Sequence, residues 1–327
     1  MSQLSKFISS SRKSGENAFG VLLDGISFIA ANMAGGVKIK DYFLRKEYKG
    51  SRYGWRAYAS ERLGEKLRQL NSPQVIAKFS DKAQFDALFA DFLHREWLYP
   101  AKTSADGLQS FLEKHPDAIA KPRAGKGGSS IEVLKTPESR AECEALLARL
   151  IREDKLVEEH IRQHEELSGF NASSVNTMRL STILTDKGTM LMAPSIRLGC
   201  NGYSADNFDS GGLSVMIDLE NGRMLNGGFN KNGEWFTSHP ESGKRIDGFI
   251  IPYWDEVKAL CLKAAEVVPD AYYVGWDVAI TPQGPVLVEG NTRAALVWQR
   301  QDRNGWGREY RTGYKGAKRL MKRRAGR

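Results

Sequence analysis

Three oxygen-bearing side chains near the end of the sequence have the spacing of a metal site on paired strands. Asp277 lies in the apolar run WDVAI, and Glu289 and Asn291 lie in VLVEGN, after a turn at Pro282. Residues two apart on a strand face the same side, so Glu289 and Asn291 project together, with Asp277 opposite them in a predicted hairpin. Oxygen ligands without a nearby His or Cys suit Mg²⁺ carried in on the phosphates of a nucleotide. Solvated acids at strand ends are the alternative, which the surrounding apolar residues argue against.

A lysine followed by a loop rich in glycine and serine forms the second group. Lys121 ends the apolar strand AIAKP, and the loop RAGKGGSS, which contains Gly127, Gly128 and Ser129, follows directly. The backbone N–H groups of such a loop can close over a triphosphate, and the lysine adds a positive charge. The loop is not a Walker A motif, because Gly127 follows Lys126 where Ser or Thr is required, and it lacks the third glycine of a Rossmann fingerprint. An ordinary turn is the alternative interpretation.

The segment LVEEHI forms the third group. An apolar strand that runs into acidic residues offers a hinge whose backbone and carboxylate can hydrogen-bond the edge of an adenine. His160 and His164 have the i, i+4 spacing of zinc ligands, but the general base of an HExxH motif is missing, so we assign no zinc site.

The elements that must position these groups indicate an α+β protein. Residues 1–75 are expected to be mostly helical. The first half also predicts a short strand over 71–79, a helix over 80–93 with Ser80 as its N-cap, strands at 118–122, 131–135 and 155–161, and a helix over 138–152. After Asn176 the pattern changes to long strands separated by turns, with a helix over 252–268 entered through Pro252. A small α/β unit followed by a larger, mostly antiparallel sheet is therefore expected.

Composition and charge limit the class of protein. The chain has 327 residues, of which 41% are hydrophobic, which suggests two domains or two lobes around a cleft. Its three cysteines are far apart, so we expect buried small side chains rather than disulfides or a metal site. From Arg300 to Arg327 there are eleven Lys or Arg and two Asp or Glu, so the whole net charge of +9 lies in this tail. The tail is interpreted either as a solvated structural helix or as an anchor for an anionic surface. No base-reading motif accompanies it, so no specific nucleic acid is expected as a partner.

The most apolar early stretch, AFGVLLDGISFIAANMAGG, is too short and too polar to span a membrane. Asp24 would also interrupt the apolar region of a signal peptide. We expect an amphipathic helix that packs on the body of the protein, with membrane contact as the alternative. The expected location is the cytoplasm, with the inner face of the membrane as a peripheral site.

Together, in this order and at this spacing, the motifs resemble the ATP-grasp superfamily over about residues 75–295. Within it the sequence is most similar to the sugar-transfer-associated ATP-grasp branch, through the stretches FSDKAQF, SVNTMRLSTIL and ADNFDSGGL. The resemblance implies a fold in which the nucleotide lies between two mainly antiparallel sheets. It also implies ATP and two Mg²⁺ ions as cofactors. Residues 1–75 do not match the usual βαβ substrate domain, so the substrate is left open.

The resemblance also implies roles for residues of this sequence. Metal ligands correspond to Asp277, Glu289 and Asn291, and catalytic cations to Arg179 and Arg293. The nucleotide contacts correspond to Lys82, Lys121, the loop residues Gly127, Gly128 and Ser129, the hinge residues Glu158, Glu159 and Ile161, a ribose-binding acid at Glu165 or Glu166, and Asn176.

The expected activity is that of an ATP-dependent carboxylate–amine ligase that forms an acyl phosphate, with a small-molecule or glycan carboxylate and an amine as partners in surface-polysaccharide biosynthesis. The alternatives are an ATP-grasp kinase that phosphorylates a hydroxyl and a non-catalytic nucleotide- or glycan-binding protein. Contact of the basic tail with an anionic membrane or glycan is a further expectation. Four parts are expected: a helical region (1–75), a small subdomain (76–157), a large subdomain (158–299) and the basic tail (300–327).

Overall fold

Two compact units make up the chain. The computed structural model describes residues 8, 17–35, 61–125, 131–200, 202, 208, 211–232, 234–296 and 305–326. The terminal unit comprises Met1–Leu70, Thr185–Gly188 and Ala295–Arg327, and the two-sheet unit comprises Asn71–Leu184 and Thr189–Ala294. The four-part division expected from the sequence stays a prediction.

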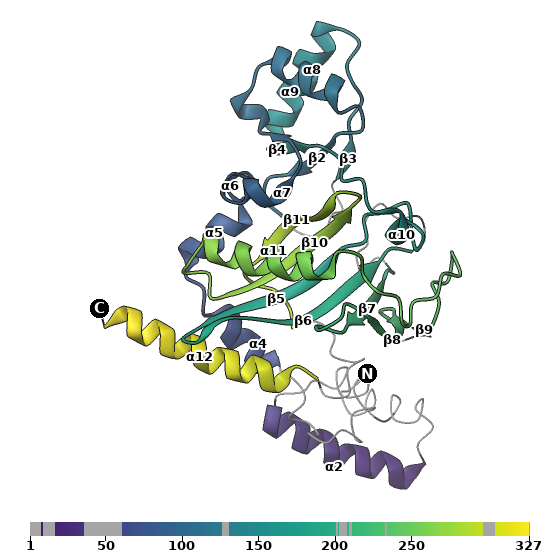
Figure 1. Cartoon of the computed structure of the whole chain (residues 1–327), viewed down its shortest axis with the longest axis vertical. Helices are drawn as coiled ribbons and strands as arrows, with labels where there is room; N and C mark the ends of the chain where they lie inside the picture. Colours follow the sequence, from purple (N-terminus) through teal and green to yellow (C-terminus); the bar gives the residue numbers. More distant parts are fainter. Residues whose placement is uncertain are drawn as a thin grey trace. The chain divides into compact units, whose positions relative to one another are not determined.

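The elements alternate between helices and short strands early in the chain and are dominated by long strands later (Figure 1). The helices are α2 (Ala18–Gly35), α4 (Glu61–Arg68), α5 (Pro73–Ser80), α6 (Lys82–Leu88), α7 (Ala90–Leu93), the 3₁₀ helix η3 (Pro100–Lys102), α8 (Ala105–Lys114), α9 (Arg140–Arg152), α10 (Glu165–Ser168), α11 (Trp254–Val267) and α12 (Gly307–Ala325). The strands are β1 (Trp97–Leu98), β2 (Ile119–Pro122), β3 (Glu132–Val133), β4 (Lys155–Glu158), β5 (Met178–Thr185), β6 (Gly188–Leu198), β7 (Leu213–Ile217), β8 (Met224–Phe229), β9 (Trp235–Phe236), β10 (Tyr273–Thr281) and β11 (Gly284–Asn291). The expected α+β class is confirmed.

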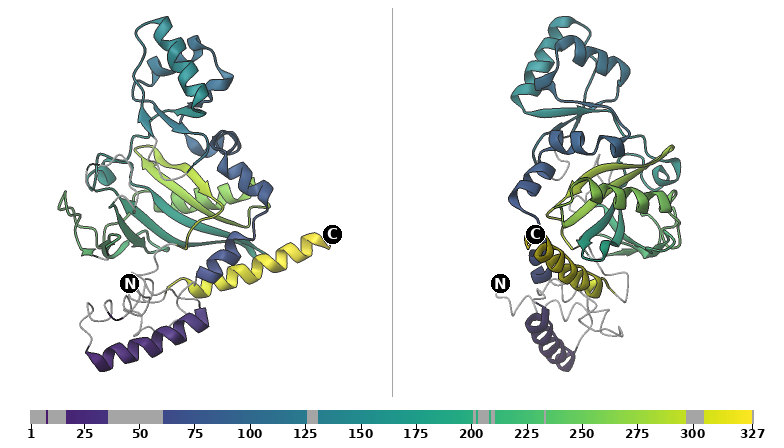
Figure 2. Two further views of the ribbon diagram at one scale, coloured as in Figure 1. Left: turned by 180° about the vertical axis from the view of Figure 1, so that it is seen from behind. Right: turned by 60° about the vertical axis from the view of Figure 1, so that its left-hand side comes forward.

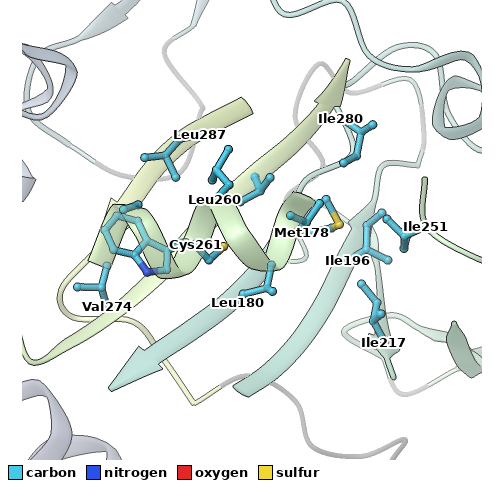
Figure 3. Close-up of a cluster of buried hydrophobic side chains, with 14 of the residues drawn as sticks. Met178, Leu180, Ile196, Ile217, Ile251, Leu260, Cys261, Val274, Ile280 and Leu287 are labelled. Atoms are coloured by element: carbon cyan, nitrogen blue, oxygen red, sulfur yellow. The ribbon is translucent and has the colours of Figure 1, made fainter. Parts of the chain in front are cut away.

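The larger sheet has seven strands in the order β11-β10-β5-β6-β7-β8-β9. The helix α11 lies across one of its faces, as the two further views also show (Figure 2). Leu260 and Cys261 of α11 pack there with Leu180 of β5 and Leu287 of β11 (Figure 3). Alternate residues of β10, which are Val274, Trp276, Val278 and Ile280, belong to the same core. Because successive strand residues face opposite sides, Asp277 of β10 is directed away from this core.

The smaller sheet has four antiparallel strands in the order β1-β4-β2-β3. Its core combines Leu108 and Leu112 of α8 with Leu150 of α9, which cover Ala120 and Val157 of the central strands. The strand that carries Lys121 and the strand that leads into the acidic hinge are therefore adjacent. The strands expected around 118–122 and 155–161 are confirmed, although β4 ends earlier, at Glu158.

The segment after α4 corrects the sequence prediction. Residues 73–80 form the helix α5, where a short strand was expected. Ser72 caps this helix by accepting a hydrogen bond from the Val75 amide, and Pro73 occupies its first turn, which are strong helix-starting signals. Ser80 is consequently the last residue of α5, and Asp81 rather than Ser80 is the N-cap of α6.

The helix α2 of the terminal unit also differs from expectation. The stretch is helical, as predicted, but most of its large apolar side chains are exposed rather than packed. Phe19, Ile26 and Met33 are 67%, 59% and 78% exposed, whereas Asp24 is fully buried. The less exposed side of the helix therefore carries Asp24 together with the half-buried Val21 and Phe28. Among the described residues, no helix is both long and apolar enough to cross a bilayer.

Candidate active site

The hairpin of β10 and β11 brings together the three predicted metal ligands. Asp277 and Glu289 are direct cross-strand partners, and Asn291 pairs with Gly275 on the same face. The Asn291 amide donates to Oε1 of Glu289 at 2.8 Å and lies 3.4 Å from Oδ2 of Asp277. A register shift follows Asp277 in this hairpin, and such irregularities commonly aim side chains at functional sites. Two carboxylates and one amide therefore converge on one patch.

Arg179 of β5 lies on the other side of β10, so that Arg179, Asp277 and Glu289 form one row across three adjacent strands. It is the direct cross-strand partner of Asp277, and its Nε and Nη2 donate to the two carboxylate oxygens, the latter at 2.8 Å. Gly275 makes this approach possible, because a Cβ there would lie 3.1 Å from Cδ of Arg179 and 2.6 Å from Cβ of Ala294. The sequence predicted Arg179 as a catalytic cation, and the structure places its guanidinium on the predicted metal ligand.

Arg197 of β6 is a second cation at this carboxylate, which the sequence analysis did not single out. Its Nη2 lies 3.2 Å from Oδ2 of Asp277. Burial alone would raise the pKa of Asp277, but Arg179 and Arg197 hold it well below its ordinary value. The backbone amide of Arg197 donates to Thr177, two residues before Arg179. The hairpin turn at 186–187 sets the register between β5 and β6. This turn could have predicted from the sequence that Arg197 lies across from the start of β5, near Arg179.

The chemistry of the donor set fits a divalent cation. Burial and the neighbouring charge of Asp277 raise the pKa of Glu289. Two carboxylates held in contact repel each other when both are ionised, and a bound cation relieves that repulsion. The set holds only two acids, in line with the absence of any cluster of three or more His, Cys, Asp or Glu among the described residues.

The two predicted lysines lie on β2 of the smaller sheet and on α6. Lys121 contacts Oε1 of Glu158, which lies diagonally across β2 and β4 on the same face. Nζ of Lys82 donates to the carbonyl of Gly125 at 3.1 Å, at the start of the glycine-rich loop. Burial and the charge of Lys121 lower the pKa of Lys82, while the charges of Glu289 and Glu158 oppose this shift. The electrostatic interactions of Lys82 therefore extend to Lys121, to Glu158 and to the predicted metal ligand Glu289.

Asp86 and Arg95 are buried members of this network that the sequence analysis missed. Arg95 donates to Oε2 of Glu158 at 3.2 Å and to the carbonyls of Leu287 and Val288 at 2.6 and 3.3 Å, so it ties β4 to β11. Burial and the charge of Glu158 raise the pKa of Asp86 to about 8. Asp86 lies four residues after Lys82 on α6, which puts both on one side of the helix. The sequence signal that could have indicated the burial of Asp86 is its position directly after the apolar Phe85 in this short helix.

The remaining predicted residues that the structure describes have other surroundings. Glu159 accepts from the amide of Glu96 at 3.1 Å and, with Ile161 and Arg95, lines a groove of about 780 Å³. The side chain of Asn176 is fully buried and hydrogen-bonded to Gln163, Leu167, Asn171 and Gly199. Three other residues, Glu165, Glu166 and Arg293, are exposed. The loop residues Gly127, Gly128 and Ser129 lie outside the described residues. Roles for all of these stay predictions.

The fold and the site together define the class of the protein. Two mainly antiparallel sheets, with the acids on the last hairpin of the larger sheet and a lysine on the smaller, form the architecture expected for an ATP-grasp protein. The chain belongs to the Sugar-transfer associated ATP-grasp family, whose model matches residues 64–309. The resemblance seen in the sequence is thereby confirmed.

Solved structures with a similar fold include three ligases or synthetases. The ATP-grasp ligase PsnB, complexed with a minimal precursor, Mg and ADP, has 18% identity and a TM-score of 0.42 over 75% of this chain and 62% of that chain. The D-alanine-D-alanine ligase of Coxiella burnetii has 12% identity and a TM-score of 0.46 over 84% and 68%. The N5-carboxyaminoimidazole ribonucleotide synthetase of Thermotoga maritima has 12% identity and a TM-score of 0.40 over 68% and 44%. The chain spans about three fifths of the length of PsnB. Comparison with curated proteins finds no match.

Proposed function

We propose that the chain is an ATP-dependent carboxylate–amine ligase that acts through an acyl phosphate, with an amine or amino acid joined to an acid of a surface polysaccharide as the product. The observation that carries this proposal is the row Arg179, Asp277, Glu289 across three adjacent strands, with Lys82 near Glu289. Membership of the Sugar-transfer associated ATP-grasp family supports the glycan context.

The proposed cofactors are Mg²⁺ and ATP. Asp277, Glu289 and Asn291 would hold the metal, and the oxygen donors of this set suit a hard cation. Bound Mg²⁺ would offset the negative charge of the triphosphate. The proposed nucleotide contacts are Lys82, Lys121 and the glycine-rich loop on the phosphates, and the hinge after β4 on the adenine.

The proposed chemistry demands a concentration of positive charge. A carboxylate oxygen of the substrate attacks the γ-phosphorus of ATP, the bond to the bridging oxygen breaks, and ADP leaves. Both reactants are anionic, so Lys82, Lys121 and Arg293 are proposed to offset their repulsion. The amine nitrogen then attacks the acyl carbon, phosphate leaves, and the nitrogen loses a proton to form the amide. Arg179 and Arg197 keep Asp277 ionised and oriented throughout.

The test is a screen of acids and amines with ADP and inorganic phosphate measured separately. A ligase releases ADP and free phosphate in equal amounts and only when both substrates are present. ADP release with a phosphorylated hydroxyl product and no free phosphate would instead establish the kinase alternative. Binding of ATP without turnover of any pair would favour the non-catalytic alternative.

A further inference from the structure

The helix α2 exposes a continuous apolar face. Six large apolar side chains recur at spacings of three and four residues, which places them on one side of a helix. Their exposed fractions are 67% for Phe19, 60% for Leu22, 48% for Leu23, 59% for Ile26, 58% for Ile29 and 78% for Met33. Exposed apolar surface of this extent on a water-soluble protein usually marks an interaction site.

The opposite side of α2 faces its own chain. Asp24 is the only charged residue of the helix, and it is fully buried. Burying a carboxylate costs far more free energy than burying an isoleucine releases, unless the carboxylate is paired. In α2 the acid is inside and these six apolar side chains are outside, which is the reverse of the general preference of apolar residues for the interior.

The same unit carries a strongly basic helix. Between Gly307 and Ala325, α12 has eight Lys or Arg and one Glu. One side is packed: Tyr310 and Ala317 are fully buried, and a Cβ at Gly316 would lie 2.7 Å from Cβ of Thr185. Arg319 donates to both oxygens of Asp186 at 2.8 and 3.0 Å. The tail therefore packs in part as a structural helix, one of the two interpretations of its sequence. The side of α12 that carries its lysines remains exposed.

The exposed basic residues of α12 include three lysines, Lys315, Lys318 and Lys322. All of the net charge of +9 belongs to residues 300–327. Pairing two copies of the chain through this unit would bring two such tails together, and like charges oppose that association. An anionic surface, in contrast, is attracted by the basic residues of the tail.

We propose that the terminal unit docks on the surface of an anionic phospholipid bilayer. The apolar face of α2 enters the boundary between headgroups and acyl chains, and the lysines of α12 lie near the anionic headgroups. An apolar helix face combined with basic residues of the same unit is a combination that binds proteins to an interface without spanning it.

The experiment measures binding of the full chain to vesicles of phosphatidylcholine with or without phosphatidylglycerol, at low and at high salt. We expect binding that requires phosphatidylglycerol and weakens with salt. Replacing Leu22, Ile26 and Ile29 together by Gln should weaken the binding about tenfold or more. The matched control is Ile250→Gln in the two-sheet unit, whose side chain is 62% exposed, and it should bind as the unchanged chain does. Met33→Gln alone provides a milder variant should the triple variant melt at a lower temperature.

The electrostatic part is tested by Lys315, Lys318 and Lys322 changed together to Gln. Binding should weaken about tenfold or more and lose much of its salt dependence. The control changes three exposed lysines of the two-sheet unit, Lys78, Lys102 and Lys135, to Gln. Absence of vesicle binding by the unchanged chain would overturn the proposal. Equal binding of the α2 and α12 variants and of their controls in the two-sheet unit would also overturn it. A dimer in solution that the Leu22, Ile26 and Ile29 variant converts to a monomer would also overturn it, because the face would then contact a second copy.

Discussion

Arg179 lies directly across the β5–β10 pair from Asp277, and its guanidinium donates to both oxygens of that carboxylate. Glu289 lies across the next pair, β10–β11, from the same Asp277. Arg179, with Arg197, keeps Asp277 ionised in a buried position, and burial together with the charge of Asp277 raises the pKa of Glu289. The cross-strand row of Arg179, Asp277 and Glu289 therefore couples the charges of both candidate metal-binding acids.

Replacing Arg179 by Gln should destabilise the protein. Only 12% of the Arg179 side chain and 3% of the Asp277 side chain are exposed. The change therefore leaves the buried carboxylate of Asp277 without its ion pair to Arg179. Breaking a buried pair on one side costs about 3 kcal/mol or more. Chemical denaturation measures the change in the free energy of unfolding. Arg245→Gln, at a side chain that is 79% exposed, is the control and should change it by less than about 1 kcal/mol. Equal effects of the two variants would mean that the buried pair contributes little.

Lys121→Met should weaken the binding of ATP with Mg²⁺ more than Lys126→Met does. Lys121 is 9% exposed and held beside Glu158, close to Lys82, so its charge is little screened by solvent. We expect about a tenfold or greater loss of affinity for Lys121→Met in a calorimetric titration, since a charged hydrogen bond contributes roughly 1.5–3 kcal/mol. A dominant effect of Lys126 with no effect of Lys121 would show that the strand and loop are oriented differently toward the nucleotide.

The pH dependence of stability should change in the variant Asp86→Asn. Burial and Glu158 raise the pKa of Asp86 from 3.8 to about 8, so the folded protein retains a proton that the unfolded chain releases. The stability that this proton contributes is present below the ordinary pKa and is lost as the pH rises through the raised one. Asn cannot titrate and resembles the protonated carboxyl.

Between about pH 5 and pH 8 the free energy of unfolding of the unchanged chain should therefore fall relative to that of Asp86→Asn, by up to ~1.4 kcal/mol per pH unit. Denaturation curves at several pH values measure this difference. Asp91→Asn, at an exposed position on α7, should show no such trend. If the free energy of unfolding depended on pH in the same way for the unchanged chain and for Asp86→Asn, the raised pKa assigned to Asp86 would be contradicted.

The strands of the larger sheet could be predicted because their residues alternate or run apolar between clear turn signals. The pairing of Asp277 with Glu289 followed from the short turn between two such strands. The helix α5 could not be recognised by periodicity alone, since seven or eight residues fit either a strand or a helix. Ser72 and Pro73 carried the decisive helix-capping signal.

The contacts that the sequence did not reveal depend on which elements become neighbours. Arg197 reaches Asp277 across β5, from a strand not adjacent to β10, and Arg95 reaches β11 from the end of α7. For α2 the pattern correctly indicated an apolar face but could not indicate what covers it. The burial of Asp24, the one charged residue of this helix, could not be predicted from the periodicity either.

Glu289→Gln provides the most direct test of the proposed active site. Gln keeps the shape of the side chain and removes a charge that Asp277 opposes, so without Mg²⁺ the melting temperature should be unchanged or slightly higher. Glu266→Gln, at an exposed position on α11, is the control.

The decisive measurement is ATP turnover of Glu289→Gln with the substrate pair that the screen identifies. The account predicts that turnover falls by about two orders of magnitude or more, because electrostatic stabilisation of the phosphate charge is lost, and that Mg²⁺ raises the melting temperature of the unchanged chain more than that of the variant. Turnover close to that of the unchanged chain, with the same response to Mg²⁺, would contradict the assignment of Asp277, Glu289 and Asn291 as the metal site.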